Sequence, residues 1–267
     1  MATTPPKKAK KEMLEVIETK DGAHTLRFKG SSTTYRSVYG AHTESKHVFL
    51  RASGIADIQR DVSVLELGLG TGLNFLHTAE YFLQSSNQFA LYYTAIERSP
   101  LPQTCLEEVH RNHDFQIPLL SMLMDGNSQA ANSRKPLQIK FKNIYLRTLP
   151  WDLFDCDFPA SSFDTHYHDP FGPKENPDAW TDLAFKHIAP WLRSTARLVT
   201  YSASSEIRKS LARAGFWTAK APGGAGKREM TIASPNANAL QGFSLLPKSK
   251  QPIGVDLAPS NPKPPTP

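Results

Sequence analysis

The sequence predicts a Rossmann-like α/β fold with a mainly parallel sheet, a terminal antiparallel hairpin and a short β-rich N-terminal lead-in. Three observations support this prediction. Strand-like and helix-like apolar patterns alternate through most of the chain, as they do in βαβ units. Gly68, Gly70 and Gly72 stand directly between a strand pattern and a helix pattern. Two further strand patterns, with only a glycine-rich stretch between them, close the domain.

The individual elements follow from these patterns and from the Gly, Pro and polar residues between them. The lead-in contains a strand at 24–28, with 47–50 as a second candidate. A variable stretch separates the second core helix from the next strand. The core is predicted as strand 62–67, helix 73–83, strand 91–96, helix 101–110, strand 137–145, strand 163–168, helix 178–191, strand 197–202, helix 205–214 and a closing pair at 216–219 and 228–233.

Composition divides the chain into one domain and two tails. Residues 1–20 are predicted to be a basic tail, 21–234 the domain with its lead-in, and 235–267 a Pro-rich tail that holds eight of the 21 prolines. The first twelve residues carry a charge of +3 and the last tail carries +2, which leaves little of the net +6 for the domain. The basicity therefore fits solvated tails and RNA contact equally well.

Several classes of protein and site are not expected. No apolar run approaches the roughly 20 residues of a membrane-spanning helix, and the N-terminus lacks an apolar signal core, so a cytoplasmic protein is expected. Cys105 and Cys156 are too few for a disulfide framework or a four-sulfur metal site, and we expect both to be buried. His166 and His168 share one sheet face without an evident third metal ligand, so buried, hydrogen-bonded histidines and no metal are expected.

The glycine loop predicts a cofactor site, because glycine permits positive φ and lacks the Cβ that keeps a ligand from the main chain. A dinucleotide-binding loop needs glycine where Leu73 stands, and the Lys-Ser/Thr pair of a P-loop is missing. Glu66, just before the first glycine, favours a cationic or amine-bearing ligand. S-adenosylmethionine meets that description, since it carries an amino group and a sulfonium.

A second acid, Glu97, ends the next strand, where its carboxylate can accept hydrogen bonds from both ribose hydroxyls of an adenosine. Glu66 and Glu97 would then hold opposite ends of one cofactor. The alternatives are that both are solvated loop acids and that the glycines form a purely structural turn. The order of elements is that of a class I S-adenosylmethionine-dependent methyltransferase.

The sequence Asp169-Pro170-Phe171 follows the fourth core strand and resembles the Asp/Asn-Pro-Pro-Phe/Tyr loop of amine methyltransferases, with one proline absent. A fixed carboxylate can orient the N–H groups of an attacking amine and take its proton. Phe171 offers a flat apolar wall for a base or for the cofactor. The alternative is a cap or turn role for Asp169 in a proline-rich loop.

A flexible glycine-rich turn at 223–226 leads into Lys227 and Arg228. Such a turn can approach nucleic-acid phosphate, with the basic pair supplying charge. A hairpin turn with solvated charges is the alternative.

Six stretches, in order between residues 44 and 230, resemble the MnmD-type family, the methyltransferase domain of the bifunctional tRNA-modifying enzyme MnmC. They are ESKHVF (44–49), LELGLGTGLNF (65–75), AIERSPL (95–101), HDPFGPKENPDAW (168–180), LVTYSASSEIRKSLARAGF (198–216) and GKREM (226–230).

This resemblance implies methyl transfer from S-adenosylmethionine to the exocyclic amine of 5-aminomethyl-2-thiouridine, or its 2-oxo form, at the tRNA wobble position. The product would be the 5-methylaminomethyl nucleoside. Asp169 would lie beside the reacting amine. The cofactor would be held by Glu66, Gly68, Gly70, Gly72 and Glu97, and the substrate side would include Phe171, Lys227, Arg228, Glu44 and Tyr201.

The chain departs from the family pattern in two places. The Gly-Asp pair near the third strand, which contacts adenine in the family, is missing from 141–152, which leaves Asn143 or Asp152 as substitutes. No second glycine-rich FAD domain of the kind found in bifunctional members follows in the sequence, so we expect the aminomethyl precursor to come from a separate enzyme or by an alternative route. The other functions considered are a different small-amine transferase of the same fold, such as an aminopropyltransferase, and a noncatalytic RNA-binding module.

Overall fold

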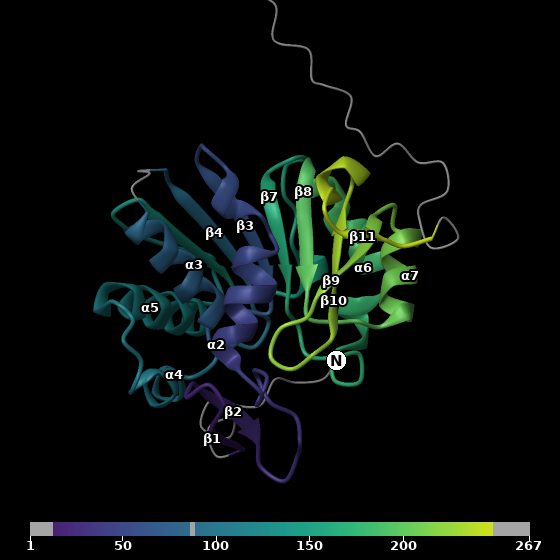
Figure 1. Ribbon diagram of the computed structural model, residues 1–267. Coiled ribbons are helices and arrows are strands. Elements are labelled where there is room, and N and C mark those ends of the chain that lie inside the picture. Colours follow the sequence, from purple (N-terminus) through teal and green to yellow (C-terminus); the bar gives the residue numbers. More distant parts are fainter. Residues whose placement is uncertain (1–12, 86–88, 248–267) are drawn as a thin grey trace, which may run out of the picture.

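The computed structural model describes residues 13–85 and 89–247. Its centre is a nine-stranded sheet with helices packed on both faces (Figure 1). The strand order is β11-β9-β10-β8-β7-β3-β4-β6-β5. This architecture confirms the predicted α/β class and the terminal antiparallel hairpin, but the sheet is mixed, with four parallel and four antiparallel strand pairs.

Five strands form the parallel centre of the sheet, so their carboxyl ends meet at one edge. They are β6 (Ile144–Leu149), β4 (Leu91–Ile96), β3 (Val62–Leu67), β7 (Phe163–His168) and β8 (Leu192–Thr200). Antiparallel strands flank them on both sides, with β5 (Leu137–Phe141) beside β6 and with β10 (Glu229–Ser234), β9 (Trp217–Pro222) and β11 (Ser244–Leu245) beyond β8.

Two apolar layers hold the helices to the sheet. Phe75 and Tyr93 belong to the layer shared with α3, α4 and α5, whereas Phe185 and Phe216 belong to the layer shared with α6 and α7. Full burial of side chains of this size contributes about 1.5–3 kcal/mol each, so the two layers hold the helices against the sheet. The helices are α3 (Leu73–Gln84), α4 (Gln103–His110), α5 (Ile117–Ser133), α6 (Asp182–Ile188) and α7 (Ser205–Arg213).

The lead-in forms a small unit of its own at one end of the molecule (Figure 1). Strands β1 (Leu14–Glu18) and β2 (His24–Phe28) pair in an antiparallel two-stranded sheet. The chain then enters α2 (Ala41–Glu44), which continues without a break into the helical segment η1 (Ser45–Arg51). The second strand candidate at 47–50 is therefore wrong, because this segment is helical and packs its apolar residues against α3.

Both domain boundaries differ from those predicted. β1 lies inside the residues assigned to the N-terminal tail, so the folded part begins before residue 21. At the other end, η6 (Ala237–Leu240) and β11 continue the fold beyond residue 234, with Leu240 and Leu246 buried. The remaining tail residues, 1–12 and 248–267, lie outside the described residues.

Two predictions in the middle of the chain are also wrong. The variable stretch after residue 110 contains the 17-residue helix α5, whose Pro118, Gly126 and many small polar residues weaken the helical pattern. The single strand 137–145 is a hairpin of β5 and β6, with Lys142 in the left-handed region at φ 51°. The sequence did not reveal this hairpin turn, because two-residue hairpin loops favour Asn-Gly or Asp-Gly and this one is Lys-Asn.

Both cysteines are free and buried, as predicted. His166 and His168 are buried and lie 3.1 Å apart between ring nitrogens, and His166 also contacts the Leu65 carbonyl. These contacts confirm a hydrogen-bonded role for the two histidines. Within 13–85 and 89–247, no helix is long and apolar enough to cross a membrane.

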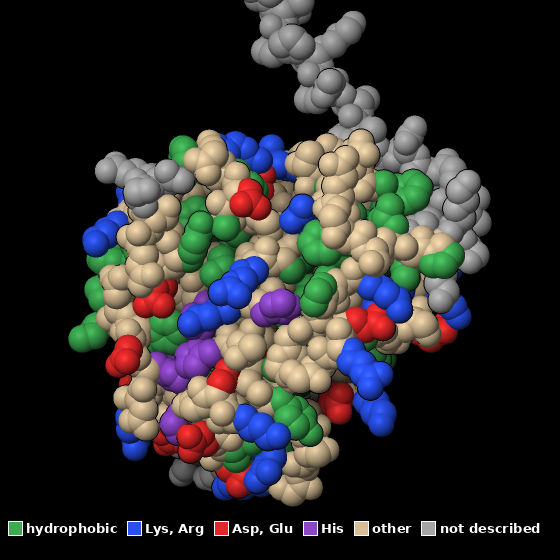
Figure 2. Space-filling view, viewed as in Figure 1, with side chains coloured by type: hydrophobic (Ala, Val, Ile, Leu, Met, Phe, Trp, Pro, Cys, Tyr) green, Lys and Arg blue, Asp and Glu red, His purple; other side chains and the backbone are tan. Residues whose placement is uncertain are grey.

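A second group of histidines gathers near α2, on the face shown in Figure 2. His42 Nδ1 lies 2.7 Å from His77 Nε2, and His42 Nε2 lies 3.1 Å from His113 Nδ1. Burial lowers the pKa of His113 to about 4, so this histidine is neutral at neutral pH. No group of His, Cys, Asp or Glu in the described part of the chain has the arrangement of a metal site.

Candidate active site

A cavity of about 660 Å³ opens at the carboxyl ends of the parallel strands. Residues that follow β3, β4, β6, β7 and β8 line it, and the lead-in segment 32–39 closes one side. Its volume lies within the roughly 300–1,000 Å³ of small-molecule sites. Ligands of open α/β sheets bind at this edge, so the fold and the cavity indicate the same site.

The cavity is acidic although the chain carries a net charge of +6. Six carboxylate side chains and three cationic side chains line it, which favours a cationic ligand. The acids are Glu44, Glu97, Asp152, Asp169, Glu175 and Asp178, and the cations are Arg36, Arg98 and Lys227.

The glycine loop joins β3 to α3 and lets two strand ends approach closely. Gly68 has φ 91°, and a Cβ there would lie 2.6 Å from the carbonyl oxygen of Asp169. Gly68 and Gly70 both line the cavity. Gly72 does not line the cavity. It packs against α5, where an added Cβ would lie 2.3 Å from the Leu123 side chain. The structure therefore brings two of the three predicted glycines to the site.

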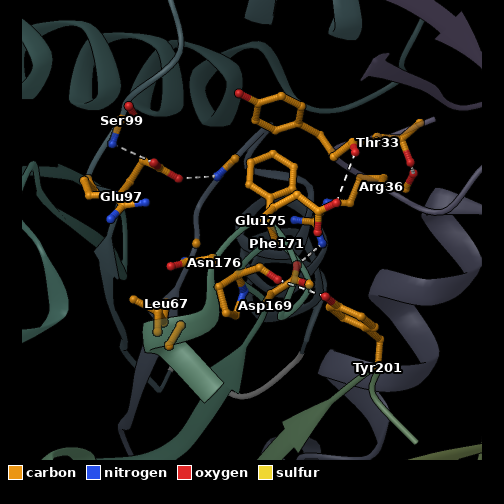
Figure 3. A pocket seen from close by; sticks show the side chains of 18 of the residues that line it. Thr33, Arg36, Leu67, Glu97, Ser99, Asp169, Phe171, Glu175, Asn176 and Tyr201 are labelled. Atoms are coloured by element: carbon orange, nitrogen blue, oxygen red, sulfur yellow. Dashed lines mark hydrogen bonds and ion pairs between the residues drawn. The ribbon is translucent and has the colours of Figure 1, made fainter. Parts of the chain in front are cut away.

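Glu97 follows β4 and has its carboxylate fixed at the cavity wall. Its Oε2 accepts a hydrogen bond from the Gly70 N–H at 3.0 Å, and its Oε1 accepts one from the Ser99 N–H at 2.8 Å (Figure 3). Each carboxylate oxygen has a further lone pair, which is available to a ligand hydroxyl.

Asp169 follows β7 and lies at the centre of the site (Figure 3). Its Oδ2 is ion-paired to Arg36 Nη1 and accepts a hydrogen bond from Asn74 Nδ2 at 2.8 Å. Among the described residues, none donates a hydrogen bond to Oδ1. Burial raises the pKa of Asp169 to about 7, against the lowering effect of Arg36. This carboxyl therefore titrates near neutral pH.

Glu66 lies beneath the cavity instead of lining it. Successive side chains of β3 alternate between the two sheet faces, and Glu66 points into the α3 side, where it is fully buried. It accepts hydrogen bonds from Asn74 Nδ2 and from the Tyr93 hydroxyl, both at 2.8 Å. Burial raises its pKa to about 8. The structure thus connects Glu66 to Asp169 through Asn74 and does not support the predicted direct contact with a ligand.

Three predicted substrate residues meet on another wall of the same cavity. Lys227 Nζ lies 3.2 Å from Glu44 Oε1 and 4.4 Å from the centroid of the Tyr201 ring. The Tyr201 hydroxyl donates a hydrogen bond to the Pro170 carbonyl at 3.0 Å (Figure 3). These residues come from α2, the end of β8 and the β9–β10 turn, so only the tertiary fold assembles them.

Phe171 forms part of an aromatic wall. Its ring lies 4.8 Å from the Tyr35 ring in an edge-to-face arrangement, and its carbonyl accepts a hydrogen bond from Trp180 Nε1 at 2.8 Å. Arg228 does not line this cavity. Arg228 lines a shallow neighbouring hollow instead. Tyr201 and Lys227 line both this hollow and the cavity.

The most consequential residues that sequence reasoning missed are Arg36 and Asn74. Arg36 lies in an irregular segment with no recognisable motif, so no signal in its neighbourhood reveals that it enters the site. Asn74 does have a signal, because it lies in the first turn of the helix that follows the glycine loop. Of the two candidates for an adenine contact, Asp152 lines the cavity, whereas Asn143 donates a hydrogen bond to the Phe89 carbonyl at 2.7 Å outside it.

Comparison with known sequences points to a methyltransferase. Residues 118–236 match the model of a family described as S-adenosyl-L-methionine-dependent methyltransferase. The chain is 37% identical over 218 residues to the tRNA 5-methylaminomethyl-2-thiouridine biosynthesis bifunctional protein MnmC of Campylobacter hominis, covering 79% of this chain and 31% of that protein. It is 31% identical over 206 residues to the protein of the same name from Cupriavidus necator, covering 75% and 31%. The chain thus spans about a third of the length of these curated relatives.

Solved structures show the same fold. The crystal structure of MNMC2 from Aquifex aeolicus has a TM-score of 0.65 at 24% identity and covers 83% of this chain and 70% of its own. Spermidine synthase from Thermotoga maritima has a TM-score of 0.53 at 10% identity, covering 86% and 72%. The family match identifies S-adenosylmethionine as the cofactor. The chain belongs to the S-adenosyl-L-methionine-dependent methyltransferase family, as an MnmD-type domain.

Proposed function

We propose that the protein transfers a methyl group from S-adenosylmethionine to the exocyclic amine of 5-aminomethyl-2-thiouridine, or its 2-oxo form, at the wobble position of tRNA. One observation carries the proposal: a buried carboxylate, Asp169, lies against the glycine loop in an acidic cavity and is held there by Arg36 and Asn74. The names of the relatives supply the nucleoside and the tRNA.

The residues of the cavity fit this cofactor. Gly68 and Gly70 line the cavity with main-chain atoms that a ligand would contact, and the Glu97 carboxylate would accept hydrogen bonds from the ribose hydroxyls. Asp152, in the loop after β6, would contact the adenine. Gly72 and Glu66 would support the site from behind. When bound, S-adenosylmethionine supplies an electrophilic methyl group on its sulfonium.

Asp169 would prepare the amine for attack. An alkyl amine is mostly protonated at neutral pH, and its nitrogen needs a free lone pair to attack the methyl carbon. Asp169 Oδ1 would accept the proton, while Arg36 and Asn74 hold Oδ2 and thereby fix the direction of the carboxylate. Because the pKa of Asp169 is about 7, the carboxylate is present at neutral pH and still basic enough to take a proton. Phe171 would offer a flat wall to the uracil ring.

The proposal is tested with labelled S-adenosylmethionine and tRNA that carries the aminomethyl nucleoside. Asp169→Asn keeps the size of the side chain but removes the base, so we expect cofactor binding to persist and methyl transfer to fall about 10²–10⁴-fold. Asp182→Asn, at a partly exposed surface ion pair, is the matched control and should retain full activity. Undiminished methylation by Asp169→Asn would remove the proposed role.

The proposed reaction consumes a primary amine, so an amine-forming reaction would have to precede it on the tRNA. A tRNA substrate would also place the protein in the cytoplasm. Wobble nucleosides from cells that lack the gene test both the substrate and its position in the modification sequence. Accumulation of the 5-aminomethyl nucleoside is the expected result, and unchanged nucleosides would contradict the proposal.

A further inference from the structure

We propose that Glu44 and Tyr201 form a subsite for the alkylammonium group of the substrate, and that the ammonium of Lys227 fills this subsite in the structure. The inference deepens the proposed function and rests on it only for the identity of the amine. The subsite itself is inferred from the geometry of three side chains.

The geometry around Lys227 Nζ is that of a bound alkylammonium ion. A carboxylate oxygen, Glu44 Oε1, lies 3.2 Å away, and the Tyr201 ring centroid lies 4.4 Å away. A carboxylate together with an aromatic face is a chemical pair that proteins use to hold such cations. Tyr201 is fixed in place by its hydrogen bond to the Pro170 carbonyl, directly after Asp169.

The two partners of this ion pair differ in exposure. The Glu44 side chain is 5% exposed, whereas the Lys227 side chain is 42% exposed. A buried carboxylate that loses its cation is costly, while an exposed lysine that leaves its partner regains water. Lys227 can therefore swing out, provided that another cation replaces it beside Glu44. A protonated alkyl amine satisfies this condition and a neutral isostere does not.

The subsite opens onto the same cavity as the base. Glu44 raises the pKa of Asp169 and Lys227 lowers it, although burial has the larger effect, so all three groups lie within electrostatic reach. An ammonium held by Glu44 and Tyr201 could then pass one proton to Asp169. The N–H bond breaks, an O–H bond forms on the carboxylate, and the electron pair stays on the nitrogen.

The test uses n-propylammonium as the cationic probe and n-propanol as its neutral isostere, with binding to the full chain followed by the NMR signals of the Tyr201 ring. Lys227→Met removes the internal competitor, so we expect n-propylammonium to bind roughly tenfold more tightly and n-propanol to bind as before. Lys227→Ala should behave in the same way. Glu44→Gln, added to Lys227→Met, should abolish the preference for the cation.

Lys220→Met is the matched control. Lys220 lies in the same hairpin, is similarly exposed and is ion-paired to Glu229. It should leave binding of both probes unchanged. Weaker or unchanged binding of n-propylammonium by both Lys227 variants would overturn the inference. Methyl transfer to tRNA is measured separately. If the tRNA is methylated but the Lys227 variants do not bind n-propylammonium more tightly, the subsite alone is refuted. If they do bind it more tightly but the tRNA is not methylated, only the proposed function is refuted.

Discussion

At the scale of single residues, the protonation of two buried acids, Asp169 and Glu66, sets the chemistry of the site. Arg36 is almost fully buried and is ion-paired to Asp169, and Asn74 donates hydrogen bonds to both Asp169 and Glu66. Burial raises the pKa of both acids, to about 7 and about 8 respectively. Protonation therefore changes at this cluster near neutral pH, where ordinary carboxyls of proteins are fully ionised.

The rate of methyl transfer should follow the ionisation of Asp169. Its folded-state pKa is raised, so the carboxyl is protonated and inactive as a base below about pH 7 and ionised above it. We expect single-turnover rates to rise with pH and to level off above about pH 8. Lys227→Met removes a charge that lowers this pKa, so its profile should move to higher pH. A flat profile for the wild-type protein, or a shift to lower pH in the variant, would contradict this account.

At the scale of elements, three strands of the parallel centre were predictable, whereas α5, η1 and the β5–β6 hairpin were not. β3, β4 and β7 have the predicted bounds, because short apolar runs between loop residues are a strong local signal. α5 was missed because its pattern is diluted by small polar residues, and η1 because four apolar or aromatic residues in a row fit a strand as well as a buried helix.

The close approach of the chain after β3 to the chain after β7 should leave no room for a side chain at Gly68. A Cβ there would lie 2.6 Å from the Asp169 carbonyl oxygen, and the residue has φ 91°. We expect Gly68→Ala to lower the free energy of unfolding by at least about 2 kcal/mol and to reduce methyl transfer. Gly30→Ala is the control, since Gly30 has φ 74° but nothing within 4 Å of the added Cβ, and it should cost about 1 kcal/mol. Equal losses in denaturant unfolding would show that the close approach is not what matters.

At the scale of the whole molecule, the lead-in unit completes a site that the sheet begins. The sheet contributes Glu97, Asp169 and Tyr201 at strand ends, whereas the segment between β2 and the end of α2 contributes Arg36 and Glu44. The site is therefore complete only when the lead-in packs on the sheet. Binding of a cofactor to this composite site should stabilise the whole fold.

Glu97→Gln should weaken that stabilisation. At a concentration of S-adenosylmethionine about 100 times the dissociation constant, the wild-type protein gains about 2.7 kcal/mol. Loss of charge-assisted hydrogen bonds to the ribose should reduce this gain to below about 1 kcal/mol at the same concentration. Glu107→Gln, on the exposed face of α4, should behave like the wild type. Thermal unfolding with and without cofactor measures the gain, and an unaltered gain in Glu97→Gln would exclude the ribose contact.

The sequence by itself determined the βαβ order, the glycine turn and the acids at strand ends, because these depend on apolar periodicity and on residues adjacent in the chain. Tertiary structure alone decided that Arg36 clamps Asp169, that Glu66 lies under the cavity and that Lys227 meets Glu44 across 183 positions of the chain. These outcomes depend on which sheet face a side chain takes and on how the lead-in packs, and both are set by the burial of surfaces that are distant in sequence.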